Sequence, residues 1–374
     1  MDISCFLALM DMNEEILYMI ALTQVPNIGI VNAKKLIEYC GSARNVFLEK
    51  KKILSKIHGI GDSIIDSLNS KKPLEVAEKE IEYATNNSIR IVSYMDTNYP
   101  ERLKSCYDSP IVLYIKGNVL PRKEKMLAVV GTRNATEYGR KACSKIISGL
   151  KDLDAGIVSG LAYGIDTCAH TAALSEGLST FAVLGTGFKT IYPYTNLHLA
   201  QEIADTGSLI TEFLADTKPD RENFPKRNRI IAGISDAVLV IEAANKGGAL
   251  ITANIANSYN REVFAIPGRI NDLFSTGCNN LIYSNKALLT TSASDIINSL
   301  NWDTDTKTKK ATNISNLNST QQAIYSLISE NGTCNVDFIA KKINIAINKL
   351  SFELLDMELN GLISCLPGKN YDCI

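Results

Sequence analysis

A cluster of basic and polar residues in front of an apolar stretch is the segment best suited to bind an anion. The segment NFPKRNRIIAGISD begins at Asn223 and surrounds Asn228 with three basic residues, Lys226, Arg227 and Arg229. Guanidinium groups donate paired hydrogen bonds to phosphate oxygens, and the ring of Phe224 offers a face on which a base can stack. The segment is therefore a candidate phosphate- and base-binding site; the alternative is a solvated, basic start of a helix.

Short apolar strands that alternate with helical segments must position this site. They follow Lys125 and read MLAVVG, GIVSG, TFAVLG, SLITEF, AVLVIEA, REVFAIPG and ALLTT. This alternation predicts a Rossmann-like parallel sheet with helices on both faces, and such sheets bind ligands beyond the carboxyl ends of their strands. Glycines at the strand ends should gather at that edge, namely Gly131, Gly160, Gly185, Gly187, Gly247 and Gly248.

Two further segments should reach the same edge. Arg133, in GTRNATEYG, follows the first strand, so we expect its guanidinium near the basic segment. Ser159 and Gly160 precede a glycine-rich entry into a helix, whose free N–H groups can hold a phosphate. No strand is followed by the GxGxxG pattern of dinucleotide-binding proteins, so the sequence disfavours NAD or FAD.

Asp166 and His170 lie four residues apart, on one face of a predicted helix. They could form an acid–base pair, or the histidine could be a buried residue oriented by the aspartate. No serine or cysteine nucleophile accompanies them at a suitable spacing. We therefore expect no catalytic residue.

Composition limits the other classes of function. The chain has 374 residues, 45% of them apolar, and a net charge of −1, so nucleic acid would be bound by a local patch. Nine scattered cysteines without a CxxC pair, and only three histidines, indicate neither disulfides nor zinc, and we expect no metal or other cofactor. The apolar start ISCFLALM lacks a basic leader, and no apolar run has membrane-spanning length, so we expect a cytoplasmic protein without a membrane partner.

The regions on either side of the sheet are predicted to be helical. Residues 1–85 contain two similar glycine turns, PNIGIVNAKKL and IHGIGDSIIDSL, which fit either phosphate-binding helix-hairpin-helix modules or plain turns in a helical bundle. The sheet domain should span residues 86–300 and be followed by a polar linker, residues 301–318. Residues 319–374 fit three helices and a hairpin, a winged-helix pattern. Residues 317–374 contain four lysines, no arginine and six acidic residues, which favours protein contact or structural support over DNA binding.

Taken in order, several segments resemble the DNA-processing protein A (DprA/Smf) family of bacterial recombination mediators. They are GTRNATEYG, SGLAYGIDTCAH, LGTGFKTIYPYTN, FPKRNRIIAGISDAVLVIEA, GGALITANIA, VFAIPG and STGCNNLI. The resemblance covers nearly the whole chain. It implies a Rossmann-like core that binds single-stranded DNA, a homodimer, and loading of the RecA recombinase onto incoming DNA during natural transformation. It also implies a sterile-alpha-motif-like N-terminal domain and a C-terminal winged helix.

The resemblance also implies roles for particular residues. Arg133 matches the arginine of the family's glycine-serine-arginine motif, with Thr132 in place of the serine, and Arg227, Asn228 and Arg229 match its arginine-asparagine-arginine motif. Phe224 stands where an aromatic residue lines the DNA pocket. Tyr194 replaces a residue that is basic in many relatives, and Gly247 replaces a frequent serine. The predicted contact set comprises Arg133, Ser159, Gly160, Tyr194, Arg221, Phe224, Lys226, Arg227, Asn228, Arg229, Gly247 and Gly248.

An enzyme with a similar sheet is the main alternative. Phosphoribohydrolases that cleave nucleoside monophosphates carry PGGxGTxxE, whose glutamate is needed for the chemistry. The comparable stretch here is KGGALITAN, with Asn254 in the place of the glutamate. Because that carboxylate is absent, we expect a binding protein and not an enzyme. A purely structural adaptor is the third possibility.

Overall fold

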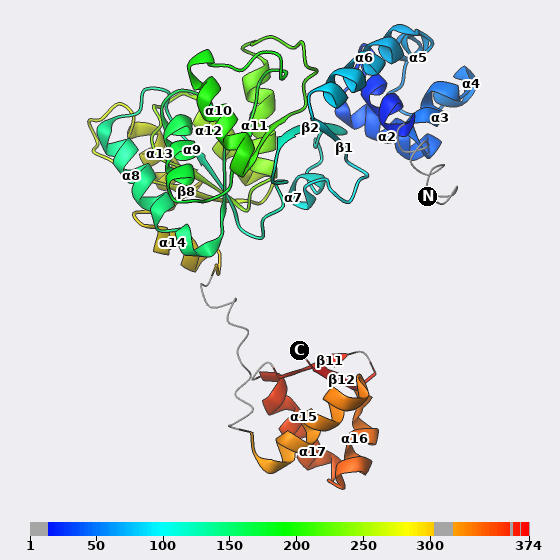
Figure 1. Cartoon of the computed structure of the whole chain (residues 1–374), viewed down its shortest axis with the longest axis vertical. Coiled ribbons are helices and arrows are strands. Elements are labelled where there is room, and N and C mark those ends of the chain that lie inside the picture. The colour runs from blue at the N-terminus through cyan, green and yellow to red at the C-terminus, as the bar shows by residue number, and fades with distance from the viewer. Residues whose placement is uncertain (1–13, 303–316, 360–361, 367, 374) are drawn as a thin grey trace. The chain divides into compact units, whose positions relative to one another are not determined.

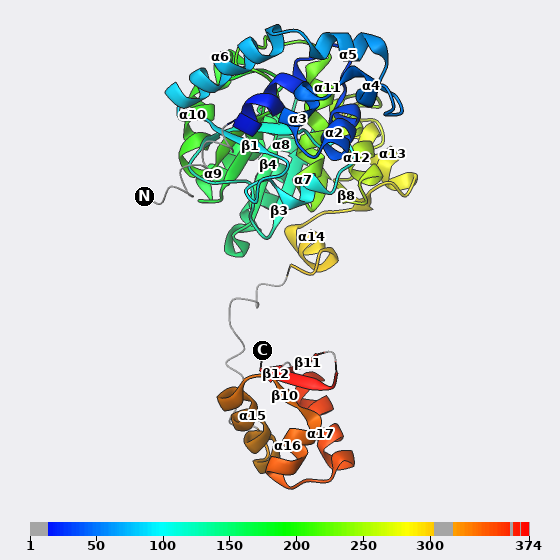
Figure 2. The same ribbon diagram turned by 90° about the vertical axis from the view of Figure 1, so that its right-hand side faces the viewer.

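The computed structural model describes residues 14–302, 317–359, 362–366 and 368–373 (Figures 1 and 2). Its contacts divide the chain into two compact units, residues 1–302 and residues 303–374. Most of the predicted linker, residues 303–316, and the apolar N-terminal stretch lie outside the described residues. Within the described part of the chain, no helix is long and apolar enough to span a membrane.

A nine-stranded sheet forms the centre of the first unit. Its strands are β1 (Arg90–Ser93), β2 (Val112–Gly117), β3 (Met126–Val130), β4 (Gly156–Ser159), β5 (Thr180–Val183), β6 (Ser208–Thr211), β7 (Ala237–Val240), β8 (Glu262–Ala265) and β9 (Leu288–Leu289). Their order is β1-β2-β6-β5-β4-β3-β7-β8-β9. The seven strands from β3 onward run parallel, whereas β2 is antiparallel to both β1 and β6.

All seven strands predicted after Lys125 are present, which confirms the Rossmann-like sheet. Strands β1 and β2 were not predicted from the sequence. They extend the sheet by antiparallel pairing, with Arg90 opposite Ile115, and lie ahead of the alternating pattern on which the prediction relied. They matter because the N-terminal helices pack against β2.

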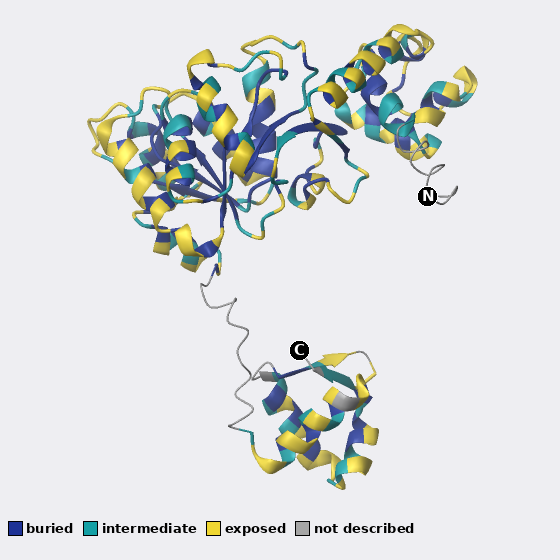
Figure 3. Cartoon of the chain, in the orientation of Figure 1, coloured by how far each residue is buried: buried dark blue, intermediate teal, exposed yellow. Residues whose placement is uncertain are grey.

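Helices cover both faces of the sheet (Figure 1). Alternate side chains of its central strands pack into the two clusters on opposite faces. Leu127 and Val129 of β3 pack with α8 (Glu137–Ser148), α9 (Ile165–Ser175) and α14 (Ala293–Ser299). Ala128 and Val130 pack with α11 (Asn223–Gly233), α12 (Gly248–Ser258) and α13 (Thr276–Tyr283). Helix α10 (Leu197–Thr206) packs on Ala182 of β5. The strands from β3 to β7 are consequently buried on both sides (Figure 3), as expected for a parallel sheet.

The N-terminal helices share a hydrophobic core with the edge of the sheet. Residues 14–23 are helical, and the helices that follow are α2 (Ile30–Cys40), α3 (Ala43–Leu48), α4 (Lys51–Leu54), α5 (Asp62–Leu68) and α6 (Lys72–Asn86). Val112 and Tyr114 of β2 belong to the same cluster of buried side chains as these helices. The helical region is therefore packed onto the sheet, within one unit.

The two predicted glycine turns have the same local design. Helix α2 begins after Gly29 and α5 begins after Gly61, and neither glycine provides a side-chain cap. Two residues before each cap, the chain turns through a positive φ, 65° at Asn27 and 90° at Gly59. Asparagine and glycine are the residues that adopt this backbone region most readily. Phosphate binding by these turns stays a prediction.

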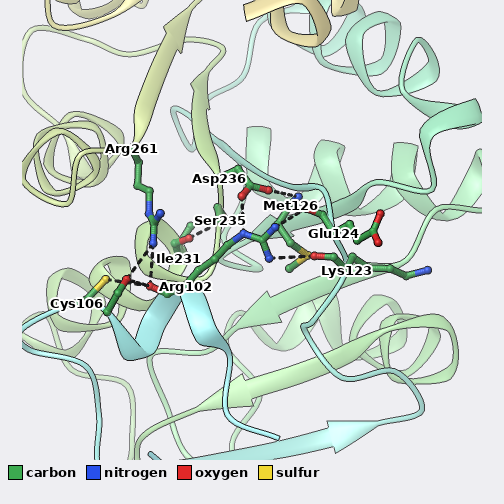
Figure 4. A network of polar contacts seen from close by, with 10 residues as sticks. Arg102, Cys106, Lys123, Glu124, Met126, Ile231, Ser235, Asp236 and Arg261 are labelled. Carbon is green, nitrogen blue, oxygen red and sulfur yellow. Dashed lines mark hydrogen bonds and ion pairs between the residues drawn. The ribbon is translucent and has the colours of Figure 1, made fainter. Parts of the chain in front are cut away.

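Arg102 connects the short helix α7 (Glu101–Lys104) to the amino ends of strands β3 and β7 (Figure 4). Its guanidinium pairs with the Asp236 carboxylate at the start of β7 and donates to the carbonyls of Lys123 and Glu124. Asp236 also accepts the N–H of Met126, at 2.8 Å. One arginine thus holds the amino ends of β3 and β7 together.

The second unit is a winged helix, as predicted. It consists of α15 (Ser319–Asn331), β10 (Cys334–Asn335), α16 (Val336–Ile343), α17 (Ile347–Leu359), β11 (Ile363–Leu366) and β12 (Asn370–Cys373). The strands pair antiparallel in the order β10-β12-β11. Buried apolar residues of all three helices, including Ile328, Ile339 and Leu354, form its core.

Candidate functional site

A pocket of about 310 Å³ opens beyond the carboxyl ends of β3 and β7. From β3 the chain adds strands in one direction as far as β6, and from β7 it adds them in the other direction. Strand order therefore reverses between β3 and β7, and open α/β sheets bind ligands at such a switch point. Gly131 after β3 and Ala243 after β7 line the pocket, together with the first turns of α11 and α12.

An arginine and two aromatic rings meet at this pocket. The Arg133 guanidinium lies over the Phe224 ring, 5.5 Å from its centroid. The Tyr192 ring lies 5.6 Å from the same ring, tilted by 45°. Arg133 is exposed and Phe224 is half-buried, so both remain accessible to a ligand. A cation over an aromatic face is the arrangement into which a phosphate and an adjoining base can fit.

The N-terminus of α12 provides the other side of the pocket. Gly247, its N-cap, has no side chain that could bond to the first turn, so the N–H groups there have no cap from that residue. Gly248 and Lys246 line the same pocket, and Lys246 is exposed. Helix N-termini attract anions through these N–H groups and the helix dipole. This side of the pocket is thus suited to a phosphate.

Arg227 holds the floor of the pocket together from inside. It is only 4% exposed, and its guanidinium donates to the carbonyls of Gly160 and Val183 and to Asn228 Oδ1. Burial lowers the pKa of Arg227 to about 10, a shift that the Asp166 carboxylate opposes. Burial likewise raises the pKa of Asp166, and Arg227 opposes that shift. The two opposite charges attract each other at the floor of the pocket, which both residues line.

Gly160 leaves room for the Arg227 guanidinium, which lies against it. A Cβ at position 160 would come within 2.4 Å of Arg227 Nη1. The neighbouring Ser159 is fully buried and donates to the Val129 carbonyl at 2.7 Å. Both predicted contact residues therefore shape the pocket from below, and neither presents a side chain to its opening.

The three basic side chains of the segment at Asn223 do not converge, contrary to the geometry expected from the sequence. Arg229 is 9% exposed and forms an ion pair with Glu212, and it also donates to the Asp108 carbonyl. Lys226 is exposed, and its Nζ lies 3.9 Å from Oε2 of Glu222. The segment is helical. Arg227 and Arg229 are two residues apart and so point in nearly opposite directions, whereas Lys226 and Arg229 are three apart and share a side of the helix. Lys226 and Arg229 accordingly line a second pocket, of about 450 Å³, next to Gly29.

The remaining predicted residues lie in different surroundings. Asn228 lines the first pocket, and its Nδ2 donates to the Gly248 carbonyl at 3.3 Å. Arg221 is exposed in the loop before α11. Tyr194 is 78% exposed and begins a short 3-10 turn, Tyr194–Asn196. Its ring is free to meet a ligand.

The predicted pairing of Asp166 with His170 is wrong. His170 is fully buried, but its Nδ1 bonds to Thr180 Oγ1 at 2.7 Å, while Asp166 accepts the N–H of Ala162 and faces Arg227. Burial lowers the pKa of His170 to about 3. The imidazole is therefore neutral at ordinary pH, in the interior between helix and sheet, and has no role as an acid–base partner of Asp166.

Two residues were missing from the predicted set, one that lines the pocket and one that contacts a lining residue. Lys246 precedes the glycine pair at Gly247, and a basic residue at a glycine-rich strand end is a signal that could have identified it. Tyr192 contacts Phe224, but nothing in its sequence surroundings indicates that it would. Asn254, where the phosphoribohydrolases carry glutamate, is exposed on α12. The carboxylate that does line the pocket is Asp166, which already faces Arg227.

Comparison with known proteins shows which family the chain resembles. Residues 90–301 match the family model for DNA recombination-mediator protein A, and residues 308–369 match the model for the DprA winged-helix domain. The chain is 33% identical to Protein Smf of Synechocystis sp. over 96% of its own length and 99% of that protein. It is 44% identical to DNA processing protein DprA of Streptococcus pneumoniae over 55% of its length and 72% of that protein.

Two solved structures share the architecture. The X-ray structure of DprA from Streptococcus pneumoniae superposes with a TM-score of 0.62 at 36% identity, covering 74% of this chain and 95% of that one. A structure of DNA processing protein A from Helicobacter pylori, whose description concerns its single-stranded DNA binding mode, has a TM-score of 0.51 at 30% identity. It covers 57% of this chain and 95% of its own.

Proposed function

The chain belongs to the DNA recombination-mediator protein A (DprA/Smf) family, and we propose that it binds single-stranded DNA in the pocket between β3 and β7. The observation that carries this proposal is the Arg133 guanidinium over the Phe224 ring, beside the uncapped N-terminus of α12. Such a site offers phosphate contacts and a stacking face, and neither of these depends on the base sequence. It suits a protein that must hold single strands of any sequence.

We assign the contacts according to how accessible each group is. Arg133, Lys246 and Arg221 are exposed cations that would contact phosphates, and the N–H groups at Gly247 and Gly248 would add to them. Phe224 and Tyr194 would stack on bases. Asn228 is only 8% exposed, but it lines the pocket and would contact the strand from the side. Lys226 would extend the phosphate path across α11.

The buried members of the predicted set would act indirectly. Arg227, Ser159 and Gly160 hold the pocket floor, and Arg229 holds the opposite face of α11 against Glu212. Direct contact of Arg227 or Arg229 with DNA stays a prediction. It would require their present hydrogen bonds to open.

The biological role we propose is that of the family: protection of incoming single strands and loading of RecA onto them during natural transformation, in the cytoplasm. A mediator has to release its strand to the recombinase. A few cations on a chain with a net charge of −1 would give binding that weakens steeply with salt, and such binding can be displaced. We propose no catalytic activity, and a release assay on nucleoside monophosphates should detect no free base.

A homodimer is part of the proposal, and the exposed edge of the sheet supports it. Strand β9 is an edge strand, and its two residues Leu288 and Leu289 are 47% and 54% exposed. Tyr283, at the end of α13, is 90% exposed. Apolar side chains on an unpaired strand edge favour association with another chain. Sedimentation of Leu288→Asp and Leu289→Asp variants would test whether this edge mediates dimerisation.

The binding site is tested by fluorescence anisotropy of a labelled oligothymidine with wild type and Arg133→Ala. We expect weaker binding, and a slope of log affinity against log salt that is shallower by roughly 0.7, the value for one phosphate contact on a single strand. Lys141→Ala is the control, because Lys141 is a 78% exposed cation paired with Glu137 on α8. If both variants bind alike, Arg133 is not in the DNA site.

A further inference from the structure

Glu80 is a buried carboxylate within the apolar face of α6. The buried residues of that helix follow helical spacing and are Pro73, Ala77, Glu80 and Ala84. Glu80 is 8% exposed, and both of its carboxylate oxygens accept the N–H of Ala215, at 2.9 and 3.1 Å. Burying a carboxylate is costly unless it is hydrogen-bonded, so this bond satisfies a group that the helix would otherwise not bury. Glu80 thus joins α6 to the loop between β6 and α11.

The backbone of Ala215 also joins that loop to a second one. The Ala215 carbonyl accepts the N–H of Lys189 at 3.1 Å, and the Thr217 carbonyl accepts the N–H of Gly187 at 3.0 Å. A Cβ at Gly187 would lie 1.9 Å from the Leu214 carbonyl oxygen. The two backbones are therefore in contact. We call these segments the paired loops, residues 184–194 after β5 and residues 212–222 after β6.

Helix α6 also contacts the paired loops through side chains. The Lys189 ammonium lies 4.9 Å from the centroid of the Tyr83 ring on α6, and it pairs with Asp216 at 2.9 Å. Phe188 and Leu214, one from each loop, pack against the hydrophobic core of the N-terminal helices. Each loop is therefore attached to the N-terminal region.

The other ends of the paired loops form the aromatic part of the pocket. The first loop carries Tyr192, and the second leads into α11, where Phe224 lies 5.6 Å from Tyr192. A Cβ at Gly185 would lie 2.8 Å from Phe224, so the first loop runs directly under that ring. The position of Phe224 relative to Arg133 thus depends on loops that α6 holds.

We propose that Glu80 is a positioning residue for single-strand binding, acting from the N-terminal helical region by fixing the paired loops and with them the contacts of Phe224. This inference rests on the proposed function of the pocket. It gives the N-terminal region a role in binding that requires no contact between its helices and DNA. The chemical task of Glu80 is to accept the Ala215 N–H; its negative charge contributes nothing favourable towards DNA.

The experiment compares Glu80→Ala with Glu82→Ala, an exposed glutamate on the same helix. Removing a negative charge by itself strengthens binding to a polyanion, so a loss of affinity in Glu80→Ala would have the opposite sign to the charge effect. We expect Glu80→Ala to bind oligothymidine roughly tenfold more weakly, equivalent to about 1.4 kcal/mol. Glu82→Ala should bind as well as wild type or slightly better.

Two further variants separate positioning from folding. Glu80→Gln keeps an oxygen that accepts the Ala215 N–H and should restore most of the affinity. Glu80→Leu fits the apolar face of α6 and should fold stably, yet it cannot accept that N–H and should bind weakly. Wild-type affinity in a folded Glu80→Leu protein, or equal affinity in Glu80→Ala and Glu82→Ala, would overturn the proposal.

Hydrogen exchange in the absence of DNA tests whether Glu80 fixes the paired loops, independently of the proposed function. In Glu80→Ala, amides of residues 184–194 and 212–222 should exchange faster, while amides of the winged helix should be unchanged. If the wild-type protein fails to bind single strands, the proposed function fails but this measurement still applies. Unchanged exchange in the paired loops would refute the role of Glu80 whatever the DNA assay shows.

Discussion

The pocket of the sheet unit and the third helix of the winged-helix unit are both places where their folds commonly bind nucleic acid, yet their chemistry differs. The pocket presents Arg133 and Lys246 beside an uncapped helix N-terminus. Helix α17 instead exposes apolar side chains, with Ile347 54%, Phe352 71% and Leu355 55% exposed. Residues 317–374 also carry a net charge of −2. A phosphate backbone is attracted to the first surface and finds little to bind on the second.

This difference shows that fold alone does not assign function. A winged helix reads DNA when its third helix carries donors and positive charge, and an apolar α17 is better suited to contact protein. In the sheet unit, by contrast, the pocket has one buried and one exposed arginine. Arg227 is buried and shapes the floor, whereas Arg133 is exposed above it. Substitutions of these two arginines and in the winged helix can show whether shaping and contact are separable, and whether DNA binding is confined to the pocket.

The largest effect should come from Arg227→Ala. The substitution leaves the carbonyls of Gly160 and Val183 without this donor and leaves Asp166 as a buried carboxylate without its cation. We expect the free energy of unfolding of the sheet unit to fall by about 3–5 kcal/mol. Trp302, the only tryptophan, is buried in the core under α8 and α14, so its fluorescence during urea unfolding reports on this unit.

Lys226→Ala is the matched control for Arg227→Ala, since it removes an exposed cation from the same helix and should change stability by less than about 0.5 kcal/mol. An Arg227→Ala protein that is as stable as this control would mean that Arg227 does not hold the floor. It would then be available to contact DNA directly, as the sequence analysis predicted.

His170 should make the stability of the sheet unit depend on pH. Its pKa is about 3 in the folded chain and 6.5 in a model peptide, so the unfolded state takes up the proton first as the pH falls. Stability is full above pH 6.5 and declines between pH 6.5 and pH 3, with a loss of about 2 kcal/mol at pH 5. The decline, followed by Trp302 fluorescence, should disappear in His170→Asn but persist in His198→Asn, whose side chain is 83% exposed.

The winged-helix unit sharpens this test, because the three histidines are His58, His170 and His198 and all belong to the other unit. Its unfolding should change little between pH 7 and pH 5. A decline of the sheet unit that remains in His170→Asn would place the responsible group elsewhere.

The same residues show what sequence can and cannot predict. Strands and helices followed from hydrophobic periodicity, and the position of Arg133 followed from the rule that parallel strands end at one edge. The partner of His170 could not be predicted, because Thr180 lies on the neighbouring strand β5 and not on the same helix. The separation of Arg227 from Arg229 was predictable in principle from helical spacing, but which face of α11 would be buried depends on tertiary packing.

Phe224→Ala should weaken single-strand binding by about 1–3 kcal/mol, the usual effect of losing one stacking ring, with little dependence on the base. Phe352→Ala is the matched control in the winged helix, because that ring is exposed but not beside a cation cluster. Binding to oligothymidine and to oligoadenosine measures both properties. Equal losses in the two variants would show that the winged helix also stacks on DNA, which would break the contrast between the two units.

The smallest effect should come from removing the winged helix, by ending the chain at about Asn313. Residues 1–302 form one unit whose contacts include the buried Trp302, so the pocket should remain intact. The deleted part carries net negative charge and an apolar third helix. We therefore expect the affinity for single strands to change by less than about twofold and the salt slope to stay the same, because no phosphate contact is removed. A shallower slope would reveal phosphate contacts in the winged helix and would show that net charge and the side chains of α17 are insufficient guides to its function. An unchanged slope with reduced affinity would instead indicate an uncharged contribution, such as contact between protein chains on the DNA.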